Sequence, residues 1–230
     1  MEQIELDGPS LVTILIRRTK QARRLSLRVS HLDGRVSMSL PLRTPLREAQ
    51  VFAREKEDWI RRTLAARPDV VRPVIGGTVL FQGRDVPVVA GSGRVAQLLD
   101  GQISVPDNPA RVGFRVAALM KLAAREQLRE ASDRYAAELG VSYGRLSLRD
   151  TRSRWGSCSS EGNLMYSWRL IMAPPEVLDY VAAHEVAHLI EMNHSPDYWH
   201  LVASIYPQYK APRAWLRNNG QKLHRVQFAD

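Results

Sequence analysis

Apolar and polar residues alternate with a period of two through much of the first hundred residues, a pattern typical of half-buried β-strands. Leu25, Leu27 and Val29 alternate with arginine and serine, and the alternation resumes at residues 36–40 after the turn residues 31–34. These two runs predict a β-hairpin. Further strands are predicted at residues 11–16, 79–81, 86–89, 95–99 and 102–105.

Two longer segments carry apolar residues at the 3.6-residue spacing of a helix that packs on a core. In residues 47–67, Phe52 and Trp59 are among the apolar side chains that share one helical face. Residues 112–139 continue such a face over many turns, and Gly140 supplies a helix stop. We therefore predict one helix in each segment.

The last third of the chain mixes short strands with helices. A strand is predicted at residues 146–149, and the runs 153–158 and 163–171 predict a second hairpin. A proline pair begins a helix over residues 175–191, since proline is tolerated in a first turn, and Ser195 is the N-cap of another helix. This order of elements predicts an α+β fold.

The proline-rich segment 106–109 is the best candidate for a domain boundary. We accordingly predict a β-rich N-terminal region with one helix at residues 1–108. Residues 109–230 form the second predicted domain, which carries the candidate chemistry described below.

Composition places the chain among ordinary globular proteins, with 44% hydrophobic and 25% charged residues. The single cysteine, Cys158, excludes an intrachain disulfide and favours a reducing compartment. The first residues lack the pattern of a secretory signal, and no run approaches the roughly 20 apolar residues of a membrane helix. We therefore expect a cytoplasmic protein without a membrane partner.

The formal net charge is +9 and comes mostly from arginine. Such a balance can indicate a nucleic-acid partner, which we keep as an alternative. The arginines are spread along the chain rather than gathered in one block, so we interpret most of them as solvated surface.

The predicted helix over residues 175–191 contains the motif His184-Glu185-Val186-Ala187-His188. Residues four apart share one helical face, so His184 and His188 can reach one zinc ion. Glu185 projects beside that ion, where it can act as a general base. The chemistry indicated by this spacing is zinc-dependent hydrolysis.

A catalytic zinc normally has three protein ligands, which leaves one ligand to be found. His194 is favoured because it lies where the helix ends and the chain turns back, just before the predicted N-cap. His200 and Glu191 remain alternatives for this third position.

The tetrahedral intermediate of hydrolysis also needs a donor for its developing negative charge. The sequence offers candidates without ranking them, and each of them is also interpreted as a structural or surface residue. The candidates are Arg154, Tyr198, Arg169 and His224.

Several short motifs together resemble the YgjP-like metallopeptidases, which are similar in turn to SprT-like and other zincin domains. The resemblance covers residues 146–220 well and the N-terminal half more loosely. The motifs are Arg154-Trp155-Gly156-Ser157-Cys158, Trp168-Arg169-Leu170, Tyr180-Val181 followed by the His-Glu-x-x-His motif, Asn193-His194-Ser195 and Tyr198-Trp199.

The resemblance implies a zincin core in residues 109–230, with a small sheet, a long backing helix and the zinc helix below a cleft. It implies zinc ligands at His184, His188 and His194, with Glu185 as the base. It also implies that an extended peptide pairs with a sheet edge beside the cleft, either the strand in residues 152–159 or its hairpin partner.

Arg154, Trp155 and Tyr198 are assigned to substrate contact, although Trp155 is also interpreted as a packing residue beside a glycine that allows close backbone approach.

The function predicted from these observations is an intracellular zinc metallopeptidase acting on a peptide or protein substrate. One alternative is a DNA-associated, SprT-like protein that acts on DNA-bound proteins. Another is a zinc hydrolase of non-peptide bonds. The sequence predicts neither the physiological substrate nor the oligomeric state.

Overall fold

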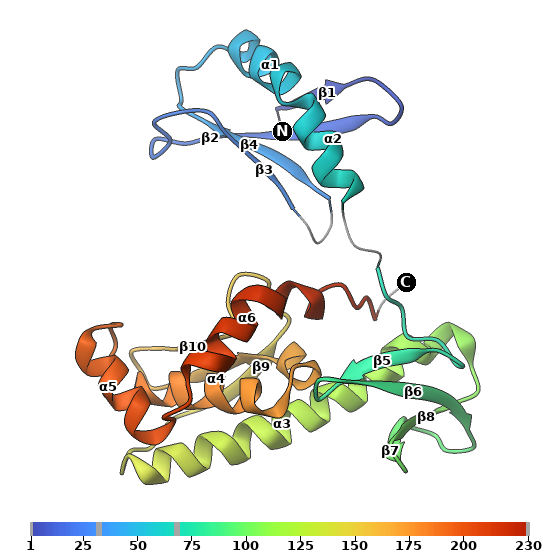
Figure 1. Ribbon diagram of the computed structural model, residues 1–230, viewed down its shortest axis with the longest axis vertical. Helices are drawn as coiled ribbons and strands as arrows, with labels where there is room; N and C mark the ends of the chain where they lie inside the picture. Colours follow the sequence, from blue (N-terminus) through green and yellow to red (C-terminus); the bar gives the residue numbers. More distant parts are fainter. Residues whose placement is uncertain (1, 31–33, 67–69, 229–230) are drawn as a thin grey trace. The chain divides into compact units, whose positions relative to one another are not determined.

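The computed structural model describes residues 2–30, 34–66 and 70–228, and its backbone contacts divide the chain into two units (Figure 1). Unit 1 comprises residues 1–69 and unit 2 comprises residues 70–230. The division lies well before the boundary predicted after residue 108. The reason is that strands of residues 78–106 share one core with the helices that follow them, so the proline-rich segment connects two parts of the same unit.

Unit 1 contains a four-stranded sheet with the order β1-β2-β4-β3, in which β2 and β4 are parallel and the other pairs antiparallel. The predicted hairpin is confirmed, because Leu27 pairs with Met38. Of its predicted turn, residues 31–33 lie outside the described residues. The strands are β1 (Gln3–Leu6), β2 (Val12–Arg18), β3 (Ser26–Val29) and β4 (Val36–Leu40).

Two helices, α1 (Leu46–Glu55) and α2 (Glu57–Ala65), stand where the sequence predicted one. The interruption is at Lys56, whose φ of −99° and ψ of 4° depart from helical geometry. Ala53 of α1 and Ile60 of α2 are both buried in the core of unit 1, so the break lets both helices contribute to that core.

Unit 2 begins with a four-stranded sheet of order β5-β6-β8-β7. The tip of its first hairpin contacts the segment just before the histidine-bearing helix, where the N–H groups of Gln82 and Gly83 donate to the carbonyls of Ile171 and Met172 at 2.8 and 3.0 Å. This sheet therefore fixes the start of that helix. The strands are β5 (Thr78–Phe81), β6 (Arg84–Gly91), β7 (Gln97–Leu99) and β8 (Gln102–Pro106).

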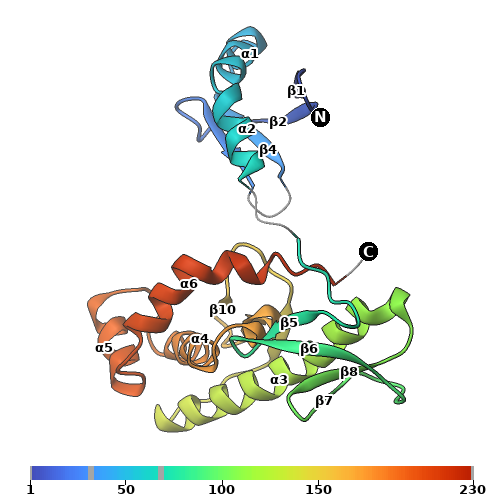
Figure 2. The ribbon, with the colours of Figure 1, turned by 45° about the vertical axis from the view of Figure 1, so that its right-hand side comes forward.

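A short 3₁₀ turn, η1 (Pro109–Arg111), leads into the long helix α3 (Val112–Glu138). The predicted stop is confirmed, since Gly140 has a φ of +65°, a conformation that glycine adopts without steric cost. Figure 2 shows α3 running along the same body as α4 and the β5–β8 sheet. Its buried face forms part of the core of unit 2.

A second sheet in unit 2 has the order β10-β11-β9. It consists of β9 (Leu146–Arg149), β10 (Gly156–Cys158) and β11 (Leu164–Ser167). The predicted hairpin is confirmed by antiparallel pairing of β10 with β11, but β11 is shorter than predicted because the chain continues as the 3₁₀ turn η2 (Trp168–Met172). Among the described strands, β10 pairs only with β11, so its other edge is unpaired.

Three helices complete unit 2: α4 (Pro175–Ala187), α5 (Pro196–Ile205) and α6 (Lys210–Leu223). The predicted N-cap of α5 is confirmed, because the Ser195 hydroxyl accepts a hydrogen bond from the backbone N–H of Tyr198 at 3.2 Å. Helix α4 is shorter than predicted and ends before His188, which is its C-cap. Helix α6 lies in a segment for which no element was predicted. The chain thus has the α+β fold expected from its sequence.

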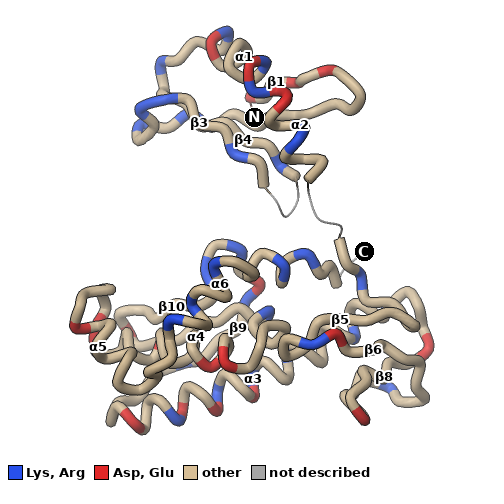
Figure 3. The backbone as a smooth tube through the Cα atoms, in the orientation of Figure 1, with Lys and Arg blue, Asp and Glu red and all other residues tan. Residues whose placement is uncertain are grey.

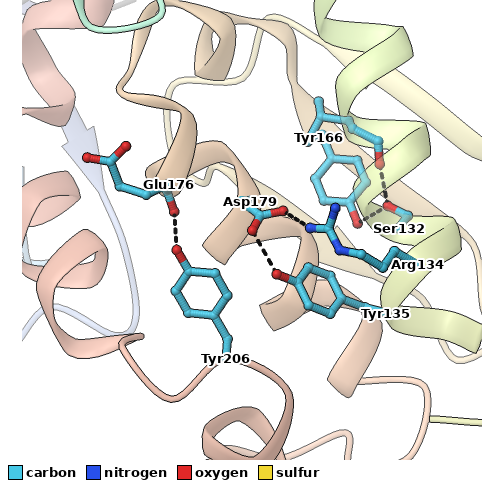
Figure 4. A network of polar contacts seen from close by, with 8 residues as sticks. Ser132, Arg134, Tyr135, Tyr166, Glu176, Asp179 and Tyr206 are labelled. Atoms are coloured by element: carbon cyan, nitrogen blue, oxygen red, sulfur yellow. Dashed lines mark hydrogen bonds and ion pairs between the residues drawn. The ribbon is translucent and has the colours of Figure 1, made fainter. Parts of the chain in front are cut away.

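A polar network holds the N-terminal half of α4 against its neighbours (Figure 4). Asp179 of α4 forms an ion pair with Arg134 of α3 and accepts a hydrogen bond of 2.8 Å from the Tyr135 hydroxyl. The hydroxyl of Tyr206 donates to the backbone carbonyl of Glu176 at 3.0 Å. These contacts position α4 from its first turns onward. Within the described residues, no helix is both long and apolar enough to span a bilayer.

Candidate metal centre

Three histidines converge where α4 ends and the chain turns toward α5. His184 lies in the last turns of α4, His188 caps it, and His194 lies in the following loop. One ring nitrogen from each lies within 4.8 Å of the others, and we call these three residues the histidine cluster. The other candidates are placed differently, since Glu191 contributes its backbone carbonyl to the ring of His188 and His200 is outside the cluster.

The spacing of the cluster fits a metal ion. The Nε2 atoms of His184 and His194 are 3.1 Å apart. Two nitrogens that each lie about 2.0–2.1 Å from one tetrahedral zinc ion are separated by roughly 3.3 Å. In the absence of a metal ion the same two nitrogens are at hydrogen-bond distance, and a bound cation would take the place of the shared proton. The donor set, three imidazoles, is one that zinc binds in catalytic sites.

Burial keeps the two helix-borne rings in the form that binds metal. Desolvation, followed by the charges of His188, His194 and Arg213, lowers the pKa of His184 to about 3. Burial is also the main cause that lowers the pKa of His188. Both rings are therefore neutral near neutral pH, and each keeps a nitrogen lone pair available as a ligand.

The orientation of His188 is fixed by two neighbours. Its Nδ1 lies 2.9 Å from the carbonyl oxygen of Glu191, which can only accept, so Nδ1 carries the proton and Nε2 is left for a metal. Tyr198 stacks on the His188 ring with a centroid separation of 4.4 Å, and its hydroxyl donates to the backbone carbonyl of His184 at 2.9 Å. Tyr198, to which substrate contact was assigned, is fully buried and instead supports the two histidines.

Glu185 is buried between α4 and the edge strand β10, with 5% of its surface exposed. Its carboxyl group occupies the space where Gly156 has no side chain, because a Cβ at residue 156 would lie 2.4 Å from Glu185 Oε1. Burial raises the pKa of Glu185 to about 8, against the opposing effects of the Arg154 charge and a backbone hydrogen bond from Cys158. A nearby cation would favour the ionised carboxylate, which can then accept a proton.

Two of the candidate donors for the intermediate, Arg169 and His224, instead make contacts within unit 2. The guanidinium of Arg169 is bound by both carboxylate oxygens of Asp150, at 2.6 and 3.0 Å. It also donates to the backbone carbonyls of Leu223 and Val226. His224 stacks with its ring centroid 4.9 Å from that of Trp155.

Trp155 is half-buried and packs against the core of unit 2, with its ring on His224 at the end of α6. Arg154 is exposed, and its charge reaches Glu185. Of the residues assigned to substrate contact, Arg154 is the one that the structure leaves exposed near Glu185.

The structure adds Arg213 of α6 to the surroundings of the cluster, a residue that sequence reasoning missed. Its guanidinium carbon lies 4.3 Å from the ring centroid of Trp199. The Trp199 centroid is in turn 5.9 Å from that of His184 and 5.7 Å from that of His194. The available signal was the helical spacing of cations in residues 210–217, which becomes informative only once α6 is known to pack beside α4.

Comparison with known proteins assigns the chain to a family. Residues 23–219 match the profile described as YgjP-like, metallopeptidase domain, which covers most of both units. A search of curated proteins found no significant match.

Two solved structures are similar over part of the chain. The metallopeptidase zymogen of Pyrococcus abyssi abylysin is 19% identical, with 44% of this chain and 98% of that chain covered and a TM-score of 0.37. The metallopeptidase zymogen of Methanocaldococcus jannaschii jannalysin is 13% identical, with 41% and 96% covered and a TM-score of 0.35.

Proposed function

Because the chain belongs to the YgjP-like metallopeptidase family, we propose that it is a zinc-dependent peptidase whose histidine cluster holds the metal and whose general base is Glu185. The observation that carries this proposal is the meeting of three imidazole nitrogens within 4.8 Å at the end of α4, where Glu185 directly follows the first ligand. The set of ligands, zinc as the metal and the role of Glu185 are the parts that experiment has to test.

A zinc ion bound to the cluster supplies Lewis-acid chemistry, because it polarises a substrate carbonyl and acidifies a water molecule. Glu185 accepts the proton of the attacking water at a carboxylate oxygen and then donates it to the nitrogen of the leaving amine. Burial raises the pKa of this carboxyl group and a bound cation would lower it again, so the ionised form is available to accept the proton of the water.

The edge of β10 that pairs with no described strand favours an extended peptide as the substrate. Trp155 and Ser159 use their backbone groups to pair with β11, through hydrogen bonds of 2.8 Å to Ser167 and 3.0 Å to Asn163. The backbone of Gly156 therefore faces the unpaired edge, next to Glu185. An added peptide strand would bring its carbonyl groups to the side of β10 where the base lies.

Metal analysis and peptide hydrolysis test the proposal directly. We expect Glu185→Gln to keep one zinc per chain and to lose turnover by at least about a thousandfold, because the proton acceptor is gone while the ligands remain. His188→Ala and His194→Ala should each lose most of the metal, whereas the control His200→Ala should keep it. Hydrolysis that persists in Glu185→Gln, or metal retained without His194, would contradict the assignment.

The same assays separate the alternative functions. Casein and peptides report peptidase activity, nucleotides report hydrolysis of non-peptide bonds, and binding to DNA at increasing salt reports a DNA-associated role. The peptidase proposal fails if zinc-loaded protein cleaves nucleotides but no peptide or protein.

A further inference from the structure

Helix α6 presents three cations on one exposed face. Lys210, Arg213 and Arg217 are spaced three and four residues apart, so they lie along one side of the helix. Together with Ala214 they line a surface hollow of about 260 Å³. Figure 3 shows Lys and Arg positions along α6, next to α4. The hollow is thus surrounded by positive charge.

Arg213 contacts the aromatic ring of Trp199. Its guanidinium carbon lies 4.3 Å from the ring centroid of Trp199, and Trp199 is stacked with Tyr209, at a centroid separation of 5.3 Å and an interplanar angle of 21°. Trp199 reaches the histidine cluster with its ring centroid 5.7 Å from that of His194. A guanidinium stacked by its face keeps the N–H groups of its edge available for hydrogen bonds. Arg213 is therefore a positioned donor, one aromatic ring away from the metal site.

Three other arginines with well-defined contacts have a carboxylate partner, whereas Arg115 donates to the backbone carbonyl of Pro106. Arg61 is paired with Glu57, and Arg134 and Arg169 are paired with aspartates. Within the parts of the chain that the structure describes, Arg213 has no carboxylate within ion-pair distance, and neither Lys210 nor Arg217 has one. The described part of the protein therefore supplies no carboxylate to these three cations.

We propose that Arg213, assisted by Lys210 and Arg217, binds a carboxylate of the peptide substrate and makes the site selective for anionic peptides. The planar fork of a guanidinium matches a carboxylate and binds both of its oxygens. The carboxylate comes from a free C-terminus or from an acidic side chain near the scissile bond. This inference rests on the proposed peptidase function and names the substrate class of the same site.

Equilibrium binding tests the preference without turnover. Zinc-loaded Glu185→Gln protein is titrated with one fluorescent, alanine-rich peptide in four forms: amidated and neutral, with a free C-terminal carboxylate, amidated with one glutamate, and amidated with one lysine. We expect at least one carboxylate form to bind about tenfold to a hundredfold tighter than the neutral form, the range of charge-assisted hydrogen bonds. The form that binds tightest identifies the source of the carboxylate.

Substitution of Arg213 in the same background identifies the residue responsible. Arg213→Gln should remove the preference and leave the neutral peptide within about threefold, while Arg213→Lys should restore part of it. Lys222→Gln is the matched control, because it removes the same charge from the far end of α6, where the ammonium bonds to Asn219, and it should leave the preference intact. Zinc content and melting temperature verify that each variant is folded and loaded.

The outcomes separate this inference from the peptidase proposal. Equal binding of neutral and carboxylate peptides to the Glu185→Gln protein overturns the carboxylate site. The proposal also fails if Arg213→Gln weakens the binding of all four peptide forms by the same factor. If the wild-type enzyme cleaves no peptide but the carboxylate preference and its loss in Arg213→Gln are observed, the peptidase proposal fails and the carboxylate site stands.

Discussion

The two ends of helix α4 differ in how their polar groups are used. Toward the N-terminal end, Asp179 is bound by an arginine and a tyrosine of α3, and the carbonyl of Glu176 is bound by Tyr206 (Figure 4). At the C-terminal end, the nitrogens of the histidine cluster face one another, and the Glu185 carboxyl is buried with a raised pKa. One end satisfies its polar groups within the protein, and the other keeps them available for chemistry.

The contacts near the N-terminal end of α4 thus position the helix, while its C-terminal end carries the candidate metal site. Substitutions at the first end should lower the free energy of unfolding and leave turnover per folded molecule unchanged. Substitutions at the second end should lower turnover per folded molecule and leave the free energy of unfolding nearly unchanged. Variants of both kinds test whether the separation holds.

The largest effect is expected at the functional end, for Gly156→Ala. The added methyl group would overlap the carboxyl group of Glu185 and displace it, and a shift of about 1 Å at a catalytic group costs on the order of a hundredfold in kcat/KM. Peptide hydrolysis measures this loss, while zinc content should not change. Ser157→Ala, one position along the same strand, is the control. A Gly156→Ala enzyme with wild-type kcat/KM would contradict the tight packing of the base.

At the positioning end, Asp179→Ala should lower the free energy of unfolding by about 1–2 kcal/mol, because a partly exposed ion pair and a hydrogen bond are lost together. Denaturant unfolding measures the change. Glu176→Ala is a matched control on the same helix, since only its backbone carbonyl bonds to Tyr206. Should Asp179→Ala reduce kcat/KM of the folded enzyme more than its stability, the two ends would not be independent.

Tyr198→Phe probes the connection between support and chemistry. It removes the hydroxyl that donates to the His184 carbonyl but keeps the ring that stacks on His188. Loss of a group that orients metal ligands typically lowers metal affinity by about tenfold or more, and we expect about tenfold here. Competition with a chromophoric chelator measures it. An unchanged zinc affinity would show that the stacked ring alone fixes the ligands.

The smallest effect concerns His224, outside α4. Burial, and then the charge of Arg169, lowers the pKa of His224 to about 4, below its ordinary value of 6.5. Between these two pH values the unfolded chain binds more protons than the folded one, so the free energy of unfolding falls as the pH is lowered through this window.

His224→Phe keeps a ring to stack on Trp155 and removes the proton site. The loss of stability between pH 7 and pH 4.5, measured on metal-free protein, should become smaller by about 1 kcal/mol. His184 contributes equally to the pH dependence of the free energy of unfolding in both proteins, so the difference between their pH profiles is due to His224. Identical pH profiles would contradict a buried neutral ring at this position.

Local signals predicted much of the secondary structure. The period-two runs around Leu27 and Met38 identified a hairpin whose strands pair as expected, and Ser195 was recognised as an N-cap from its position before a proline. The histidine motif required only helical spacing. These features are determined by residues a few positions apart, which is why sequence patterns show them.

Contacts between distant segments were beyond such patterns. The division after residue 69 depends on strands 78–106 sharing a core with α3. The packing of Glu185 on Gly156 brings α4 against β10, which lies almost thirty residues earlier in the chain. Helix α6 was missed because its apolar positions alternate with several charged and polar residues.

The histidine cluster has a further consequence for how the protein assembles. All three histidines come from the single stretch 184–194, so bringing them together closes only a short loop and costs little chain entropy. The carboxyl group of Glu185 reaches its final place only when β10, from another part of the chain, has docked against α4. Contacts of low sequence separation cost less loop entropy, so we expect the three histidines to meet, and the proposed metal site to form, before the Glu185 carboxyl group is in place. A nascent molecule would then carry metal while it is still inert.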